Sequence, residues 1–83
     1  MTNEQIQSKV LDIIQPYVKN EEAFANVTSE TTMLGDLQIN SARLVDIILG
    51  FEDVFDIEIE DDDADKVNSV GDAVKLLSEK LAA

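Results

Sequence analysis

Residues 34–59 read LGDLQINSARLVDIILGFEDVFDIEI, and the second half of this stretch decides the fold of the chain. Its apolar residues recur at the i, i+4, i+7 and i+11 spacing of one helix face: Leu44, Ile48, Phe51 and Phe55. Either Asn40 or Ser41 can cap such a helix, because a short polar side chain accepts hydrogen bonds from the first unpaired backbone N–H groups. We therefore predict an amphipathic helix that begins near residue 40 and ends near Asp56.

The residues that follow this helix alternate between apolar and acidic, as in a short strand: Ile57, Glu58, Ile59 and Glu60. No other segment of the chain offers a partner strand, and a strand without partners is not stable. We expect an extended loop here.

The residues at the start of the chain predict a first helix. Thr2 and Gln5 have the spacing of a capping box, and apolar residues follow at helical intervals: Ile6, Val10, Ile13 and Ile14. This helix is expected to run from about residue 3 to Gln15, because Pro16 ends or kinks a helix.

From about residue 20 to residue 40 the hydrophobic period is lost. Residues 27–32 are rich in side chains that bond to their own backbone and so disfavour helix. We expect a long loop that apolar side chains fix to the core: Phe24, Val27, Met33, Leu34 and Leu37.

The C-terminal part predicts two more helices. A short helical turn over residues 61–66 would place Ala64 and Val67 inward. Ser69 and Asp72 repeat the capping-box spacing, and one face of a last helix carries apolar residues: Val70, Ala73, Leu77 and Leu81. The predicted fold is all-α, a single domain over residues 1–83. It is a small four-helix bundle of three main helices and one short one, with a long loop between the first two.

Composition limits what this domain can do. The chain has 83 residues with 18 acidic and 6 basic side chains, a net charge of −12 and a pI of about 4.1. It has no cysteine and no histidine, and therefore no thiol nucleophile, no imidazole base and none of the nitrogen or sulfur ligands of zinc. We expect neither catalysis by the chain alone nor a metal site.

The negative charge also limits the partners. It opposes binding to nucleic acid or anionic lipid, which basic side chains drive. The sequence shows no signal peptide and no apolar run long enough to enter a membrane. We expect a cytoplasmic monomer whose partners have basic surfaces.

Ten of the acidic residues lie between Leu44 and Asp65, where no basic residue occurs. Such a run is typical of a solvated helix surface, and it also suits docking of basic partners. Its last residues, Asp61, Asp63 and Asp65, imitate the start of a calcium-binding loop, and Asp72 falls where the twelfth ligand of that loop would be. The imitation fails at Lys66, where that loop needs a glycine for its turn, so we expect no dedicated calcium site.

Ser41 is the residue with the most open role. It suits an N-cap, which is the common role of serine at a helix start. Because the chain has no histidine to act as a base, any reaction at this hydroxyl would need another enzyme. Ser41 is therefore either a cap or a site of modification.

Several stretches together resemble one known family. They are LGDLQINS at residues 34–41, the acidic helix that follows, FDIEI at residues 55–59 and VGDAV at residues 70–74. The family is that of the acyl carrier proteins, and the resemblance covers nearly the whole chain. In that family, a serine in an Asp-Ser-Leu motif at the start of the second helix carries 4'-phosphopantetheine through a phosphodiester.

The resemblance implies that a phosphopantetheinyl transferase attaches the arm to Ser41. The arm would carry acyl intermediates as thioesters to enzymes of fatty acid, specialised lipid or polyketide biosynthesis. It would also bring the sulfur that a chain without cysteine lacks. The chain would thus be a carrier and not an enzyme.

The resemblance also implies two sets of binding residues. Acidic residues would guide acyl-transferring or acyl-modifying enzymes with basic docking surfaces: Asp46, Glu52, Asp53 and Asp56. Apolar residues match the positions where the family shelters the acyl chain: Val45, Phe51, Ile59 and Val67. The second set suits the core of a bundle equally well, and the sequence leaves both roles open.

Three residues depart from the family motif. Asn40 stands in place of the usual Asp, Ala42 in place of Leu, and Arg43 where an acidic residue is frequent. Asn caps a helix as well as Asp, but a partner would meet one carboxylate fewer, one apolar side chain fewer and one positive charge more. We predict a specialised carrier and not the housekeeping one. The alternative is an acidic helical interaction module without a prosthetic group, in which Ser41 only caps the helix.

Overall fold

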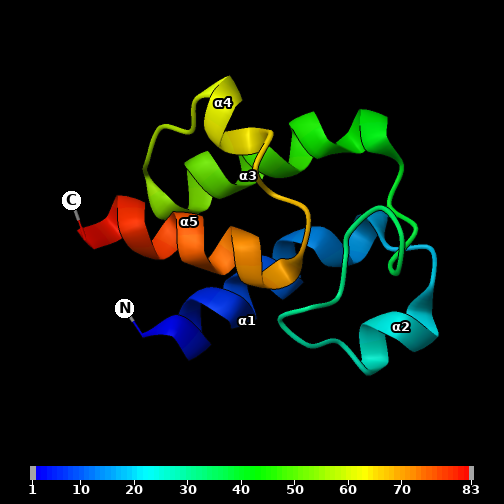
Figure 1. Cartoon of the computed structure of the whole chain (residues 1–83). Coiled ribbons are helices and arrows are strands. Elements are labelled where there is room, and N and C mark those ends of the chain that lie inside the picture. Colours follow the sequence, from blue (N-terminus) through cyan, green and yellow to red (C-terminus); the bar gives the residue numbers. More distant parts are fainter. Residues whose placement is uncertain (1, 83) are drawn as a thin grey trace.

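The computed structural model describes residues 2–82 and contains helices joined by loops (Figure 1). Three long helices form the bundle: α1 (Asn3–Ile14), α3 (Leu44–Phe55) and α5 (Val70–Ala82). Shorter ones lie between them: η1 (Gln15–Tyr17), α2 (Glu21–Ala25), η2 (Ser41–Arg43) and α4 (Asp61–Ala64). Helix α1 contacts both α3 and α5. The predicted all-α bundle with three main helices is confirmed.

Helix α1 begins as its sequence predicts. The backbone N–H of Gln5 donates to Thr2 Oγ1 over 3.2 Å, and the Thr2 N–H donates to Gln5 Oε1 over 3.0 Å, which completes a capping box. Pro16 stands in the first turn of η1, directly after α1 ends. The buried face of α1 consists of three residues: Ile6, Val10 and Ile14.

The long connection between α1 and α3 contains a helix that the sequence did not predict. Asn20 caps α2 by accepting from the Ala23 N–H over 3.2 Å. At five residues this helix is too short to show a hydrophobic period, so the prediction of an unbroken loop was wrong at this point.

Most of the residues predicted to fix this loop do so. Met33 and Leu37 are buried, and Phe24 and Val27 pack against the core. Leu34 is 46% exposed, so its predicted role was wrong. Ile39, which the prediction did not include, is buried in the core instead, with 3% of its surface exposed.

Backbone hydrogen bonds tie the same loop to the start of α5. Met33 N–H donates to the Asn68 carbonyl over 2.9 Å, and Val70 N–H donates to the Thr31 carbonyl over 2.9 Å. Between residues 2 and 82, the only strand-like pairing is one isolated bridge from Thr32 to Ser69. The loop is therefore held by hydrogen bonds that no local pattern reveals.

Helix α3 buries a slightly different face from the predicted one. Phe51 and Phe55 are buried as expected, Leu44 and Ile48 are only partly buried, and Ile47 is buried although the pattern did not include it. Asp56 ends the helix in the left-handed conformation, with φ 53° and ψ 53°. Residues 57–60 then form the predicted extended loop, without a strand.

Helices α4 and α5 lie close to their predicted positions. Ala64 packs on the core and Val67 is buried, although α4 ends at Ala64, before Lys66. Asp72 N–H donates to Ser69 Oγ and Ser69 N–H donates to Asp72 Oδ2, both over 3.1 Å, so the second capping box is confirmed. Leu81 is 37% exposed and was wrongly assigned to the buried face, where Val74 lies instead. No helix within residues 2–82 is both long and apolar enough to cross a membrane.

Candidate functional site

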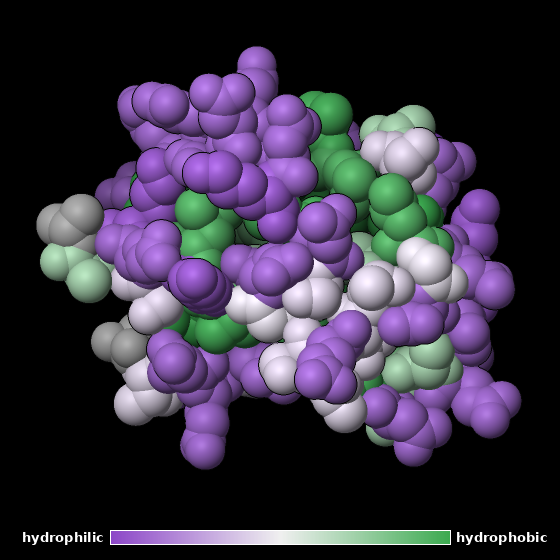
Figure 2. Space-filling view, viewed as in Figure 1, coloured by the Kyte–Doolittle hydropathy of each residue, from purple (hydrophilic) through white to green (hydrophobic). Residues whose placement is uncertain are grey.

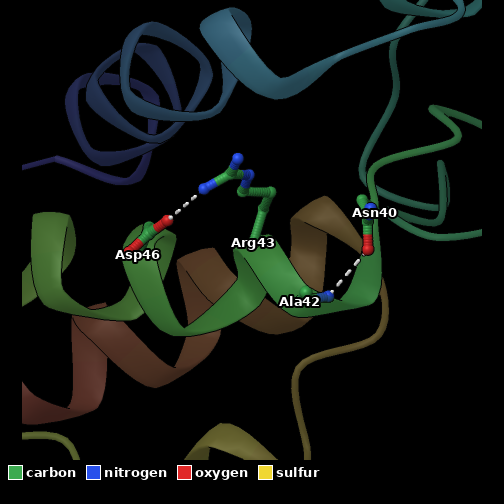
Figure 3. A network of polar contacts seen from close by, with 4 residues as sticks. All are labelled: Asn40, Ala42, Arg43 and Asp46. Carbon is green, nitrogen blue, oxygen red and sulfur yellow. Dashed lines mark hydrogen bonds and ion pairs between the residues drawn. The ribbon is translucent and has the colours of Figure 1, made fainter.

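Ser41 is the first residue of η2, the short turn that leads into α3, and it is exposed. The cap of this turn is Asn40, whose Oδ1 accepts from the Ala42 N–H over 2.9 Å (Figure 3). The Asn40 carbonyl also accepts from the Arg43 N–H over 2.8 Å. Of the two residues predicted as possible caps, Asn40 is therefore the one that caps the turn. The Ser41 hydroxyl takes part in none of the hydrogen bonds within residues 2–82.

A strained residue and a buried one hold this turn at the surface. Gln38 has φ 56°, a left-handed conformation that costs a residue with a Cβ roughly 1 to 2 kcal/mol. The next residue, Ile39, is buried, and its N–H donates to the Met33 carbonyl over 3.0 Å. Because Ile39 is anchored, Asn40 and Ser41 emerge from the core directly after it.

Arg43 lies two residues after Ser41 and forms an ion pair on the surface. Its Nη1 is 3.2 Å from Asp46 Oδ2, and the two side chains are 60% and 45% exposed (Figure 3). An exposed pair of this kind adds little to stability. The pair nevertheless brings a positive charge to the start of α3 and offsets the negative charge of Asp46.

A cavity of about 320 Å³ opens between α3 and α4. All four residues predicted for an acyl pocket line it: Val45, Phe51, Ile59 and Val67. Phe51, Ile59 and Val67 belong to the buried core, whereas Val45 is 65% exposed. Three of the four side chains thus belong to the core and also form part of the cavity wall.

The surface beside the cavity is apolar. Val45 and Leu49 follow each other by one helical turn on α3 and are both exposed, and both line the cavity. In Figure 2, apolar atoms come to the surface along α3 next to the hydrophilic atoms over α4. An apolar ligand can therefore reach the cavity along an apolar path.

The four acidic residues predicted to guide partners have different surroundings. Asp46 pairs with Arg43, and the half-buried Glu52 accepts from the Ile59 N–H over 3.0 Å, which fixes the loop after α3. Asp53 and Asp56 are exposed and form none of the ion pairs within residues 2–82. Asp53 and Asp56 are thus the two whose carboxylates are most available to a partner.

The residues that imitate a calcium loop are engaged elsewhere. Asp63 lies 2.8 Å from Lys80 Nζ, and this hydrogen-bonded ammonium group lowers the pKa of the Asp63 carboxyl. Hydrogen bonds from the N–H groups of Ser69 and Asn68 lower the pKa of Asp72. Within residues 2–82, no three acidic residues lie close enough together to hold a metal ion.

The fold and the site define a class of protein. An exposed serine at a helix start, with no base beside it, can be modified by another enzyme but cannot act as a nucleophile by itself. Next to it lies an apolar cavity that can hold part of a bound group. A small helical domain with these two features suits the presentation of a covalently attached group.

Comparison with known proteins agrees with this class. The chain is 42% identical over 78 residues to the acyl carrier protein of Amoebophilus asiaticus, covering 94% of this chain and 95% of that one. It is 36% identical over 80 residues to the acyl carrier protein of Thermotoga maritima, covering 96% of both. A search against protein-family models found no match.

A solved structure gives the same result. The fold is similar to that of an acyl carrier protein from Enterococcus faecalis, with a TM-score of 0.78 and 34% identity. The match covers 96% of this chain and 99% of that one. The chain belongs to the acyl carrier protein family.

Proposed function

We propose that Ser41 Oγ carries 4'-phosphopantetheine through a phosphodiester and that the chain delivers acyl groups on this arm as thioesters. The observation that carries the proposal is that Ser41 is exposed at the helix start while Asn40 supplies the cap. The alternative of an interaction module in which Ser41 only caps the helix loses its main support, because the capping role is already filled. The receiving enzymes would belong to fatty acid, specialised lipid or polyketide biosynthesis.

The surroundings of Ser41 suit a phosphodiester. Unpaired N–H groups and the helix dipole make the start of a helix favourable for an anion, and η2 leads into the twelve residues of α3. The bound arm would supply the thiol, which the chain lacks. The chain itself would position the arm and shelter what it carries, without catalysing a reaction.

The cavity between α3 and α4 would take the acyl chain. Its wall is formed by the apolar side chains named above, with the exposed Val45 in the first turn of α3, directly after the turn that carries Ser41. An apolar chain that leaves water for this space gains the free energy of burying its methylene groups, about 0.8 kcal/mol each. The cargo would thus be favoured in the cavity whenever no partner extracts it.

The acidic surface of α3 would guide partners. Asp53 and Asp56 offer exposed charge, and Asp46 and Glu52 add to the negative potential of the same helix. A phosphopantetheinyl transferase or an acyl-handling enzyme with basic side chains would be attracted to it. Monomeric state and cytoplasmic location stay predictions.

Intact mass spectrometry tests the proposal. The chain is incubated with coenzyme A and a broad-specificity phosphopantetheinyl transferase, beside Ser41→Ala and the matched control Ser8→Ala, which changes an exposed serine of α1. We expect the mass of one phosphopantetheine to be added to the native chain and to Ser8→Ala, and nothing to Ser41→Ala. Addition to Ser41→Ala would contradict the assignment, and no addition to any variant with several transferases would contradict the proposed function.

A further inference from the structure

Arg43 has an unusual position in the charge distribution of this chain. It is the only basic residue between Lys19 and Lys66, and it lies two residues from the serine proposed to carry the arm. Its side chain is 60% exposed, so a protein that covers Ser41 meets it. The position of this single charge calls for an explanation.

The fold does not provide that explanation. Asn40 caps the turn without help from Arg43, and the Arg43 side chain makes no capping hydrogen bond at the start of α3. Its exposed pair with Asp46 stabilises the helix only slightly, and a cation at the N-terminal end of a helix is disfavoured by the dipole. Arg43 is therefore placed where it adds little to folding but affects binding.

The pair with Asp46 divides the surface of α3 into two regions. Near Ser41 the charges of Arg43 and Asp46 offset each other, and the guanidinium group stays accessible (Figure 3). The exposed acids Asp53 and Asp56 lie further along the helix, roughly 18 to 22 Å from Ser41 at a rise of 1.5 Å per residue. Near Ser41 a partner meets the Arg43 guanidinium paired with Asp46, and it meets the unpaired carboxylates of Asp53 and Asp56 only further along the helix.

We infer that Arg43 determines which enzymes accept this carrier. It fits an enzyme that has a carboxylate beside the site where it receives Ser41 or the arm, and basic residues about three helical turns or more away. It opposes an enzyme whose whole docking groove is basic, because like charges in an interface cost binding energy. This inference rests on the proposed function of Ser41 and names the chemistry of the partner.

The test compares the transfer of phosphopantetheine to the native chain and to three variants. Arg43→Glu reverses the charge, Arg43→Ser removes it, and Lys9→Glu makes the same change in net charge at an exposed position on α1. The transferase is one whose carrier groove is lined by lysine and arginine beside its catalytic site. Because docking and not chemistry is changed, kcat/KM of Arg43→Glu is expected to rise about fivefold or more, mainly through KM. Arg43→Ser should lie between Arg43→Glu and the native chain, and Lys9→Glu should stay within about twofold of the native chain.

Two further measurements distinguish an effect on partner recognition from an effect on folding. The gain of Arg43→Glu should shrink in about 0.5 M salt, because screening weakens charge pairs at an interface. With a transferase that carries Asp or Glu beside its catalytic site, Arg43→Glu should lose activity instead. Equal kcat/KM for Arg43→Glu and Lys9→Glu with both enzymes would overturn the inference while the proposed function stands. No transfer to any chain would overturn the proposed function, and the inference with it.

Discussion

Gln38 stores strain next to the candidate site. Its φ of 56° is disfavoured for a residue with a Cβ, and glycine would adopt the same conformation without that cost. The strained turn brings the chain from the buried Leu37 to the buried Ile39, after which Asn40 and Ser41 reach the surface.

This strain gives the first prediction. Gln38→Gly should raise the free energy of unfolding by about 1 kcal/mol, because the relief of strain exceeds the extra entropy of the unfolded chain. The matched control Gln7→Gly, inside α1, should lower it by a similar amount, about 1 kcal/mol. Urea unfolding of both variants checks this, and a loss of stability in Gln38→Gly would show that the turn is not strained.

The two neighbours Asn40 and Ser41 differ sharply in their structural roles. Asn40→Ala removes the side chain that accepts from the Ala42 N–H and should cost about 1 kcal/mol of unfolding free energy. Ser41→Ala changes an exposed side chain that does not cap and should cost less than about 0.5 kcal/mol. Thermal or urea unfolding compares them directly. If Ser41→Ala proved the more costly, the serine would be the cap after all.

At the scale of elements, α4 is held by little packing and one ion pair. It has four residues, and Glu60 at its N-terminus makes no side-chain capping bond. Asp63 pairs with Lys80 of α5 at 2.8 Å, which connects the wall of the cavity to the long helix. This pair lowers the pKa of Asp63 and raises that of Lys80.

The lowered pKa of Asp63 predicts a dependence of stability on pH. A carboxyl whose pKa is lower in the folded chain stabilises the fold above its ordinary pKa of 3.8, and this contribution is lost as the pH falls through the folded value. The native chain should therefore be more stable than Lys80→Met at pH 7, and the difference should shrink below pH 3.8. Urea unfolding at several pH values measures it, with Lys9→Met as the control for charge alone. A difference that stays constant between neutral and acid pH would contradict this role of the pair.

Elements with a clear period or a capping box could be predicted from the sequence. The starts of α1 and α5 were predicted from Thr2 with Gln5 and from Ser69 with Asp72, because each signal lies within one helical turn. Helix α2 and the position of Ile39 could not be predicted. Both depend on contacts between distant segments, such as the hydrogen bond from Met33 to Asn68, that leave no local pattern.

Only part of the candidate site could be predicted, because some of its contacts also leave no local pattern in the sequence. The four residues predicted for an acyl pocket line the cavity because positions that face the core of a bundle also line the space within it. The Arg43–Asp46 pair and the hydrogen bond from Ile59 to Glu52 were not found, since side-chain geometry decides them. As a result, acidic residues that look alike in the sequence differ in the fold, where Asp46 and Glu52 are bonded and Asp53 and Asp56 are exposed.

At the scale of the whole molecule, the charge of −12 opposes compaction, and ten acids lie between Leu44 and Asp65. Added salt screens this repulsion, so the melting temperature at neutral pH should rise as sodium chloride is increased from about 0.01 to 0.5 M. Divalent cations should have the same effect at lower concentration. Calorimetry or circular dichroism follows the transition, and a melting temperature indifferent to salt would contradict the prediction.

The central claim is that Ser41 holds an arm whose acyl cargo enters the cavity between α3 and α4. Methyl NMR tests this most directly, by comparing the chain loaded with octanoyl-phosphopantetheine and with acetyl-phosphopantetheine. We predict shifts between the two forms for the cavity methyl groups of Val45, Ile59 and Val67, and almost none for Val10 of α1, which does not line the cavity. Identical spectra, with the arm attached in both, would show that the cargo stays outside and would contradict the claim.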